Sequence, residues 1–266
     1  MALIGALLAL ALLGGCSQQQ AVPAASNGQS EQAAKVDPAT VATISGVIHF
    51  NGPVPAPKAI DMSGDPDCHG QNQSESLVVH DGRLANVVVY VKDGLPQSGW
   101  MGARLAVMGT ESPDPISGII RQSGCRYEPH VGAIMAGQSL TIYNNDLTTH
   151  NVHPVPQVNR QWNVSQLPHS DPVTKTFREP ELMIPLTCNV HPWMRAYINV
   201  LPNPFFAVSS AEGNFTIQGL PPGTYTIGAV HESLGEQTAQ ITVAPKQNAP
   251  LDFTFSGPPK AASAAK

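Results

Sequence analysis

Short runs in which apolar and polar residues alternate recur along most of the chain. Residues 43–50, Thr-Ile-Ser-Gly-Val-Ile-His-Phe, alternate in this way and precede a turn signal, Asn-Gly-Pro. Residues 85–93 contain three consecutive valines, which favours a strand buried on both faces. Clear helical periodicity is scarce, and 23 Gly and 25 Pro residues separate the runs. The pattern therefore predicts an all-β protein built from many short strands.

The chain begins with an apolar run over residues 1–16. This run is short for a transmembrane helix and is typical of the central region of an export signal. Its end, Leu-Gly-Gly-Cys16, resembles a bacterial lipobox, although the basic residues that usually precede the apolar run are missing. The resemblance implies a signal peptide, lipid attachment at Cys16, and a membrane anchor on the periplasmic side of the cell envelope. The alternative is a soluble periplasmic protein with an unmodified Cys16.

Both terminal segments beyond this signal lack apolar periodicity. Residues 17–41 are rich in Gln, Ala, Ser and Asn, and we expect a flexible linker there. Residues 257–266 are expected to form a disordered tail, and Gly and Pro interrupt residues 94–118, which we interpret as a connection. Charged residues make up 12% of the chain and the net charge is −5, so no basic surface for nucleic acid is predicted.

Four residues with metal-binding side chains have a suggestive spacing. Cys188, His191 and Met194 form the pattern C-x-x-H-x-x-M, and His150 lies upstream in Asn-Asn-Asp-Leu-Thr-Thr-His-Asn-Val-His. One thiolate, two imidazoles and a weak axial thioether suit a copper ion that exchanges single electrons with little rearrangement. We expect a strand to end at Cys188 and a tight turn, stiffened by Pro192, to bring His191 back to the same ion. The sequence therefore predicts one bound copper ion.

Residues 115–203 resemble the cupredoxins, the family of plastocyanin-like blue copper proteins. The resemblance rests on HNVH at 150–153 and CNVHPWM at 188–194, and on strand-like segments at 127–146 and 175–200. The short ligand loop is most similar to that of the amicyanins. The implied fold is a Greek-key β-sandwich, and the implied domain spans residues 111–203.

The cupredoxin resemblance also assigns roles to individual residues. His150, Cys188 and His191 become the equatorial ligands and Met194 the axial ligand. Asn151 is expected to hold the ligand loops together by hydrogen bonding near the Cys188 sulfur.

Two further residues lie close to the predicted ligands. Trp193 either packs over the ligand loop as a shield or contributes to a contact surface. His153 is expected to share the strand face of Asn151, away from the ligands, because alternate residues of a strand point to the same side.

The remaining cysteines, Cys68 and Cys125, form an even pair in a chain that carries an export signal. A disulfide is therefore the default interpretation. The alternative is a second metal site that combines these two cysteines with His69 and His130.

The C-terminal part of the chain resembles a second family. AEGNFTI and GLPPGTYTI, within residues 205–256, are similar to the carboxypeptidase regulatory-like, transthyretin-like β-sandwich, and residues 46–53 and 85–91 resemble its opening strands. We therefore predict a discontinuous sandwich, residues 42–110 plus 204–256, with the copper domain inserted. The alternative is one elongated β-protein with a separate C-terminal module.

These features favour a periplasmic electron carrier over an enzyme, since four ligands leave no position for a substrate. We expect an exposed His191 ring edge beside an apolar patch that receives a redox protein, such as a cytochrome or a dehydrogenase; the patch comprises Pro154, Val155, Pro156, Pro192 and Trp193. The alternatives are a copper-binding, delivery or sensing lipoprotein without electron transfer, and a module that binds a partner or a carbohydrate. Asp61, Asp65 and Asp67 are interpreted as a polar loop, because their spacing lacks the closing Glu of a calcium site.

Overall fold

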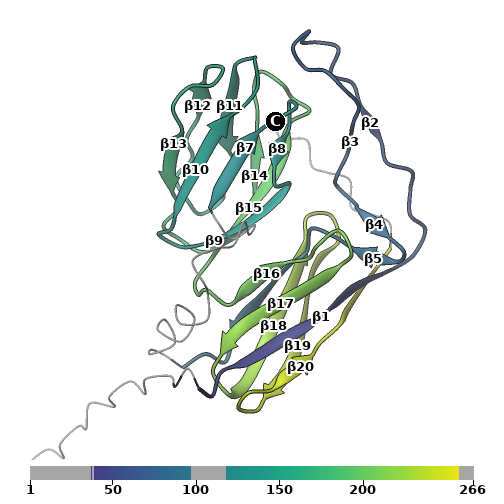
Figure 1. Ribbon diagram of the computed structural model, residues 1–266, viewed down its shortest axis with the longest axis vertical. Coiled ribbons are helices and arrows are strands. Elements are labelled where there is room, and N and C mark those ends of the chain that lie inside the picture. Colours follow the sequence, from purple (N-terminus) through teal and green to yellow (C-terminus); the bar gives the residue numbers. More distant parts are fainter. Residues whose placement is uncertain (1–36, 38, 97–117, 258–266) are drawn as a thin grey trace, which may run out of the picture. The chain divides into compact units, whose positions relative to one another are not determined.

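The computed structural model of the chain describes residues 37, 39–96 and 118–257. These residues form strands joined by turns and loops, with no helix among them, so the all-β prediction is confirmed (Figure 1). The signal peptide with Cys16, most of the 17–41 linker, most of the 94–118 connection and all but the first residue of the 257–266 tail lie outside the described residues. Within the described ranges, no helix is long and apolar enough to cross a membrane.

One sandwich is built from strands at both ends of the described chain. Its six-stranded sheet contains β1 (Ala42–Asn51), β4 (Val79–His80), β5 (Arg83–Leu84), β17 (Asn214–Leu220), β20 (Asn248–Pro250) and β21 (Phe253–Ser256). The strand β1 runs antiparallel to β17 and parallel to β20 and β21. Its four-stranded sheet has the order β16 (Phe206–Val208), β6 (Val88–Asp93), β18 (Gly223–His231), β19 (Gly235–Val243).

Sequence alternation explains how this sandwich closes. Along β1, Ile44, Ile48 and Phe50 are buried and face the same core as Val89 of β6. All four residues from Val88 to Val91 are buried, which confirms the prediction that this strand is covered on both faces. Strands from 42–93 therefore share sheets with strands from 206–256, while the predicted domain limits themselves remain a prediction.

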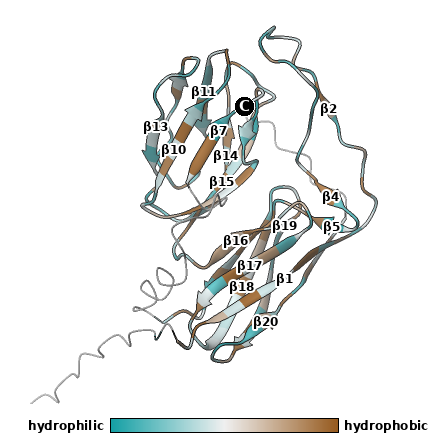
Figure 2. Cartoon of the chain, in the orientation of Figure 1, coloured by the Kyte–Doolittle hydropathy of each residue, from teal (hydrophilic) through white to brown (hydrophobic). Residues whose placement is uncertain are grey.

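A second sandwich lies between these two groups of strands in the sequence. Its four-stranded sheet has the order β13 (Val173–Thr176), β10 (Ser139–Asn144), β7 (Ile119–Gln122), β8 (Tyr127–Glu128). Its five-stranded sheet has the order β12 (Val164–Gln166), β11 (His150–Pro154), β14 (Glu181–Thr187), β15 (Arg195–Leu201), β9 (Val131–Met135). The pairs β7–β10 and β9–β15 are parallel, and both β7 and β10 carry hydrophobic positions, drawn brown in Figure 2.

A long excursion between β1 and β4 carries the small ribbon of β2 (Ala59–Ile60) and β3 (Asn72–Gln73). The loop between these two strands contains Cys68, which forms a disulfide with Cys125 in the turn between β7 and β8. This bond uses both sulfurs, so the alternative metal site with His69 and His130 is wrong. The loop is thereby attached to the sandwich that contains the predicted copper ligands.

Candidate metal centre

The predicted ligand loop is closed at its base by a strand pair. Thr187 at the end of β14 faces Arg195 at the start of β15, so residues 188–194 form the connection. Within it, the His191 amide donates to the Cys188 sulfur at 3.3 Å, and the Met194 amide donates to the His191 carbonyl at 2.9 Å. These two bonds curl the loop so that Cys188 and His191 point to the same side.

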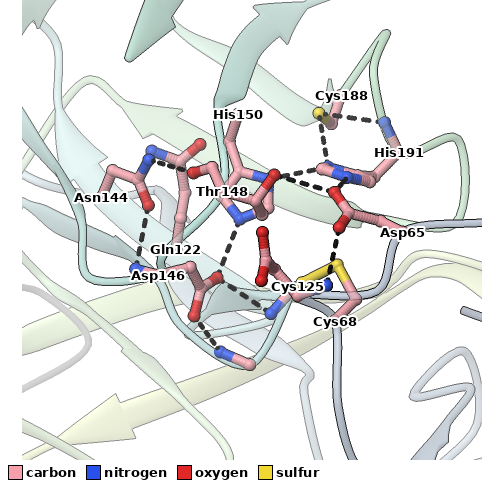
Figure 3. Close-up of polar contacts among 12 residues, drawn as sticks. Asp65, Cys68, Gln122, Cys125, Asn144, Asp146, Thr148, His150, Cys188 and His191 are labelled. Atoms are coloured by element: carbon pink, nitrogen blue, oxygen red, sulfur yellow. Dashed lines mark hydrogen bonds and ion pairs between the residues drawn. A yellow bond between two sulfur atoms is a disulfide. The ribbon is translucent and has the colours of Figure 1, made fainter. Parts of the chain in front are cut away.

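The structure brings three of the predicted ligands together (Figure 3). The Nδ1 atom of His150, the first residue of β11, lies 2.8 Å from Nδ1 of His191, which lies 3.8 Å from Sγ of Cys188. Donor atoms of the three side chains all lie within 4.8 Å of one another, and all three residues are buried. One thiolate and two imidazole nitrogens that converge at this distance fit a single copper ion.

The fourth predicted ligand, Met194, is 2% exposed and packs in the same core cluster as Cys188. A buried thioether on this side of the core is compatible with an axial ligand, and that role remains a prediction. Cys188 is the free thiol among the described residues; two other groups with metal-ligand side chains contain a disulfide cysteine and have no thiolate to offer.

Asn151 joins the ligand loop to β11. Its Oδ1 accepts hydrogen bonds from the backbone amides of Asn189 at 2.7 Å and Val190 at 3.3 Å, and it lies 3.3 Å from the Cys188 sulfur. Its Nδ2 donates to Oδ1 of Asn163. One amide side chain therefore fixes the positions of the first loop residues relative to the strand of His150.

His153 lies outside the group of donor atoms. Its Nδ1 bonds Oδ1 of Asn189 at 3.0 Å, and its Nε2 bonds the amide of Gln161 at 2.5 Å. Both ring nitrogens are used to fasten loops, which leaves neither for a metal ion.

A carboxylate meets the outer nitrogen of each predicted histidine ligand. Nε2 of His150 donates to Asp146 at 2.8 Å, and Nε2 of His191 donates to Asp65 at 2.7 Å (Figure 3). A hydrogen bond at Nε2 leaves Nδ1 as the metal-binding atom and makes the ring more basic. Both inward-facing nitrogens are therefore the ones that are available to an ion.

The expected exposure of the His191 ring edge is wrong. His191 is only 2% exposed, because Asp65 covers its outer nitrogen and the Trp193 ring lies beside it with centroids 4.9 Å apart. Trp193 is half-buried and donates to the Cys125 carbonyl at 3.3 Å, so it packs over the ligand loop. The predicted apolar patch is also smaller than expected, because Pro154 is buried and contributes no surface to it. Pro192 is exposed, as the patch requires.

The charges around the donor atoms favour a thiolate. Burial raises the pKa of the Cys188 thiol. A hydrogen bond from His150 and nearby backbone amides outweigh this effect and lower the pKa to about 7. Burial lowers the pKa of His150, and the neighbouring Asp146 and Cys188 outweigh this effect and raise it to about 9. A thiolate beside an imidazolium is a ligand pair that a metal ion engages by displacing the imidazolium proton.

Comparison with known families adds to this geometry. Residues 194–256 match the model of the carboxypeptidase regulatory-like domain. The predicted resemblance of the C-terminal segment to this family is confirmed. The regulatory-like match starts at Met194 and not at the predicted residue 204, so it includes β15. In the structure, β15 pairs with β14 and β9 and belongs to the five-stranded sheet of the second sandwich. A comparison with curated proteins found no match.

The chain is also similar to cupredoxins of known structure. A novel purple cupredoxin from Nitrosopumilus maritimus is 22% identical, with 31% of this chain and 97% of that chain covered and a TM-score of 0.27. An amicyanin variant in its Cu(I) form is 25% identical over 34% of this chain and 86% of that chain, with a TM-score of 0.27. A copper-containing nitrite reductase from Thermus scotoductus SA-01 is 21% identical over 36% of this chain and 24% of that chain, with a TM-score of 0.30. Because these TM-scores are low, the function proposed below is drawn from the donor atoms.

Asp65 and Asp146 were not among the predicted site residues. Asp146 lies four residues before His150, so its sequence position offered a signal. Asp65 lies 126 residues from His191 and outside the regulatory-like match, and its sequence neighbourhood indicated only a polar loop.

Proposed function

We propose that this protein binds one copper ion through His150, Cys188, His191 and Met194 and carries single electrons. The observation that supports this most directly is the convergence of two Nδ1 atoms and one thiol sulfur, all from buried side chains. A copper ion held there supplies reversible one-electron chemistry, because this donor set accommodates both Cu(I) and Cu(II).

The protein's own groups hold the donors in a fixed arrangement. The His191 amide donates to the Cys188 sulfur, so the thiolate has a backbone hydrogen-bond donor. Asn151 ties the loop to β11 by accepting from the Asn189 amide. Both imidazoles are oriented by carboxylates at Nε2. Donors that do not move between oxidation states favour rapid electron transfer.

The same geometry counts against two other roles. Four donors fill the coordination positions, which leaves none for a substrate, and we therefore propose a carrier and not an enzyme. Cys188 and both histidines are at most 3% exposed, which disfavours rapid release of copper to another protein. We further propose a lipid anchor at Cys16, a periplasmic location and a redox protein partner such as a cytochrome or a dehydrogenase.

The absorption spectrum of the Cu(II)-loaded protein tests the copper function. We expect an intense thiolate-to-copper band, reversible one-electron reduction, and loss of the band in Cys188→Ser. His153→Asn serves as the control, because it removes a nearby imidazole that already bonds Asn189 and Gln161, and it should keep the band. A coloured Cys188→Ser protein, or rapid loss of Cu(I) to a chelator from the unmodified protein, would falsify the proposal.

A further inference from the structure

Asp65 makes three hydrogen bonds that fix its carboxylate. Its Oδ2 accepts from Nε2 of His191 at 2.7 Å and from the Thr148 hydroxyl at 2.8 Å, and its Oδ1 accepts from the backbone amide of Asp67 at 2.8 Å. The Asp65 side chain is 16% exposed, against 2% for His191. The carboxylate therefore lies between the buried ring and solvent.

The loop that carries Asp65 is tied to the copper sandwich on both sides of this residue. Downstream, Cys68 is bonded to Cys125, and Nδ2 of Asn72 donates to the Gly124 carbonyl at 2.8 Å. Upstream, Met62 is buried in the same core cluster as Cys188. These attachments hold the loop against the turn between β7 and β8.

That same turn also supports the second carboxylate. The amides of Gly124 and Cys125 donate to Asp146 at 2.7 and 2.9 Å, and Asp146 accepts from Nε2 of His150. Asp146 therefore belongs to the internal structure of the copper sandwich. Asp65 differs, because it comes from a segment that precedes this sandwich by more than fifty residues of sequence.

We propose that Asp65 is a positioning residue for the copper centre: it fixes His191 with Nδ1 toward the ion and closes the edge of the ring to solvent. This inference rests on the copper function proposed above. A carboxylate that accepts a hydrogen bond from Nε2–H makes the ring a stronger donor to the metal. Its negative charge also stabilises Cu(II) more than Cu(I), because the attraction grows with the charge of the ion. Asp65 therefore lowers the reduction potential of the site.

Closure of the ring edge also changes where electrons leave. With Nε2 occupied and Trp193 beside the ring, a redox partner cannot touch His191 itself. The exposed residues nearest in sequence are Asn189, Val190 and Pro192 of the same loop. A partner that docks at the ligand loop contacts these residues and the Asp65 loop.

Substitution of Asp65 by Asn and by Ala separates its charge from its hydrogen bond. Asp67→Asn and Asp67→Ala are matched controls, since Asp67 is exposed, lies two residues away and changes the net charge equally. For Asp65→Asn we expect about tenfold weaker Cu(II) binding, the lower end of the usual range for a lost partner of a histidine ligand. If Cu(I) binding is unchanged, this loss corresponds to a rise of about 59 mV in reduction potential. The Asp67 variants should match the unmodified protein.

A readout on the metal-free protein makes the test independent of copper. In the unmodified protein, the proton on Nε2 of His191 should be visible by NMR and protected from exchange with water. It should exchange in Asp65→Ala and stay protected in Asp67→Ala. Unchanged protection together with an unchanged potential in the Asp65 variants would overturn the inference. Absence of a thiolate-to-copper band in the unmodified protein would instead count against the copper function, and the proton exchange would still decide the role of Asp65.

Discussion

Removal of the Cys68–Cys125 disulfide should destabilise the metal-free protein by a large and calculable amount. The perturbation is the double change Cys68→Ala and Cys125→Ala, which leaves the free thiol of Cys188 in place. The bond joins residues 57 apart in sequence. For a loop of this length, the lost chain entropy of the unfolded state corresponds to about 4 kcal/mol in the chain-entropy model.

Urea unfolding, followed by tryptophan fluorescence, measures this loss. Trp162 and Trp193 pack against the core cluster that contains both disulfide cysteines, so their emission reports on this sandwich. We expect the midpoint to fall and the slope to rise, because the unfolded chain without the cross-link is less compact and exposes more surface.

Reduction of the unmodified protein is the matched control. It breaks the same bond without removing the sulfurs, and Cys125 is fully buried, so any extra loss in the double variant measures the packing of the two side chains. A loss below about 1 kcal/mol in both experiments would refute the reasoning. It would mean that other interactions already restrict the unfolded chain between these two residues.

Two other measurements test further predictions, one on the pH dependence of stability and one on the membrane anchor. His231 is buried, and its Nδ1 accepts a hydrogen bond from the Ser233 amide. Burial lowers the pKa of His231 to about 4. The unfolded chain therefore takes up a proton near pH 6.5, while the folded protein does not. The contribution of neutral His231 to the free energy of unfolding is therefore fully present above pH 6.5, and it falls by up to about 3 kcal/mol toward pH 4. His231→Asn keeps the acceptor without the titration and should show a smaller loss in urea unfolding between pH 7 and 4.5; equal losses in both proteins would contradict this. For the membrane anchor, the intact mass of protein purified from membranes should show acyl chains on Cys16, and an unmodified Cys16 would rule the anchor out.

The features that sequence alone predicted are local ones. Residues 43–50 alternate in hydropathy and lie within β1, and the valines at 87–89 lie at the start of β6 and just before it. The ligand loop is local too, because residues 188–194 fit between two paired strands whatever the rest of the chain does. Short-range spacing was therefore enough to place Cys188 beside His191.

The features that sequence missed depend on contacts between distant segments. Exposure of His191 was inferred from its position in a loop, and a loop gives no information about what covers it. The cover comes from Asp65, 126 residues away, and no periodic pattern connects the two positions. The even pair of cysteines was the one signal in the sequence that the segment near Asp65 contacts the second sandwich, because it predicted a bond between residues 68 and 125. It did not say that the turn of Cys125 supports Asp146 and thereby adjoins His150.

The energetics explain why Asp65 needs the disulfide nearby. Fixing a residue's backbone costs about 1–2 kcal/mol, so ordering the residues from Met62 to Cys68 costs roughly 7–14 kcal/mol. A hydrogen bond to a charged group contributes about 1.5–3 kcal/mol, so the three that Asp65 accepts contribute roughly 4.5–9 kcal/mol and offset that cost only in part over most of its range. Burial of Met62 and the bond from Cys68 to Cys125 must supply the remainder, the latter by restricting the loop before folding begins. Loss of the disulfide should therefore weaken the hold of the carboxylate on His191, which would link the oxidised state of two cysteines to the electrostatics of the proposed copper centre.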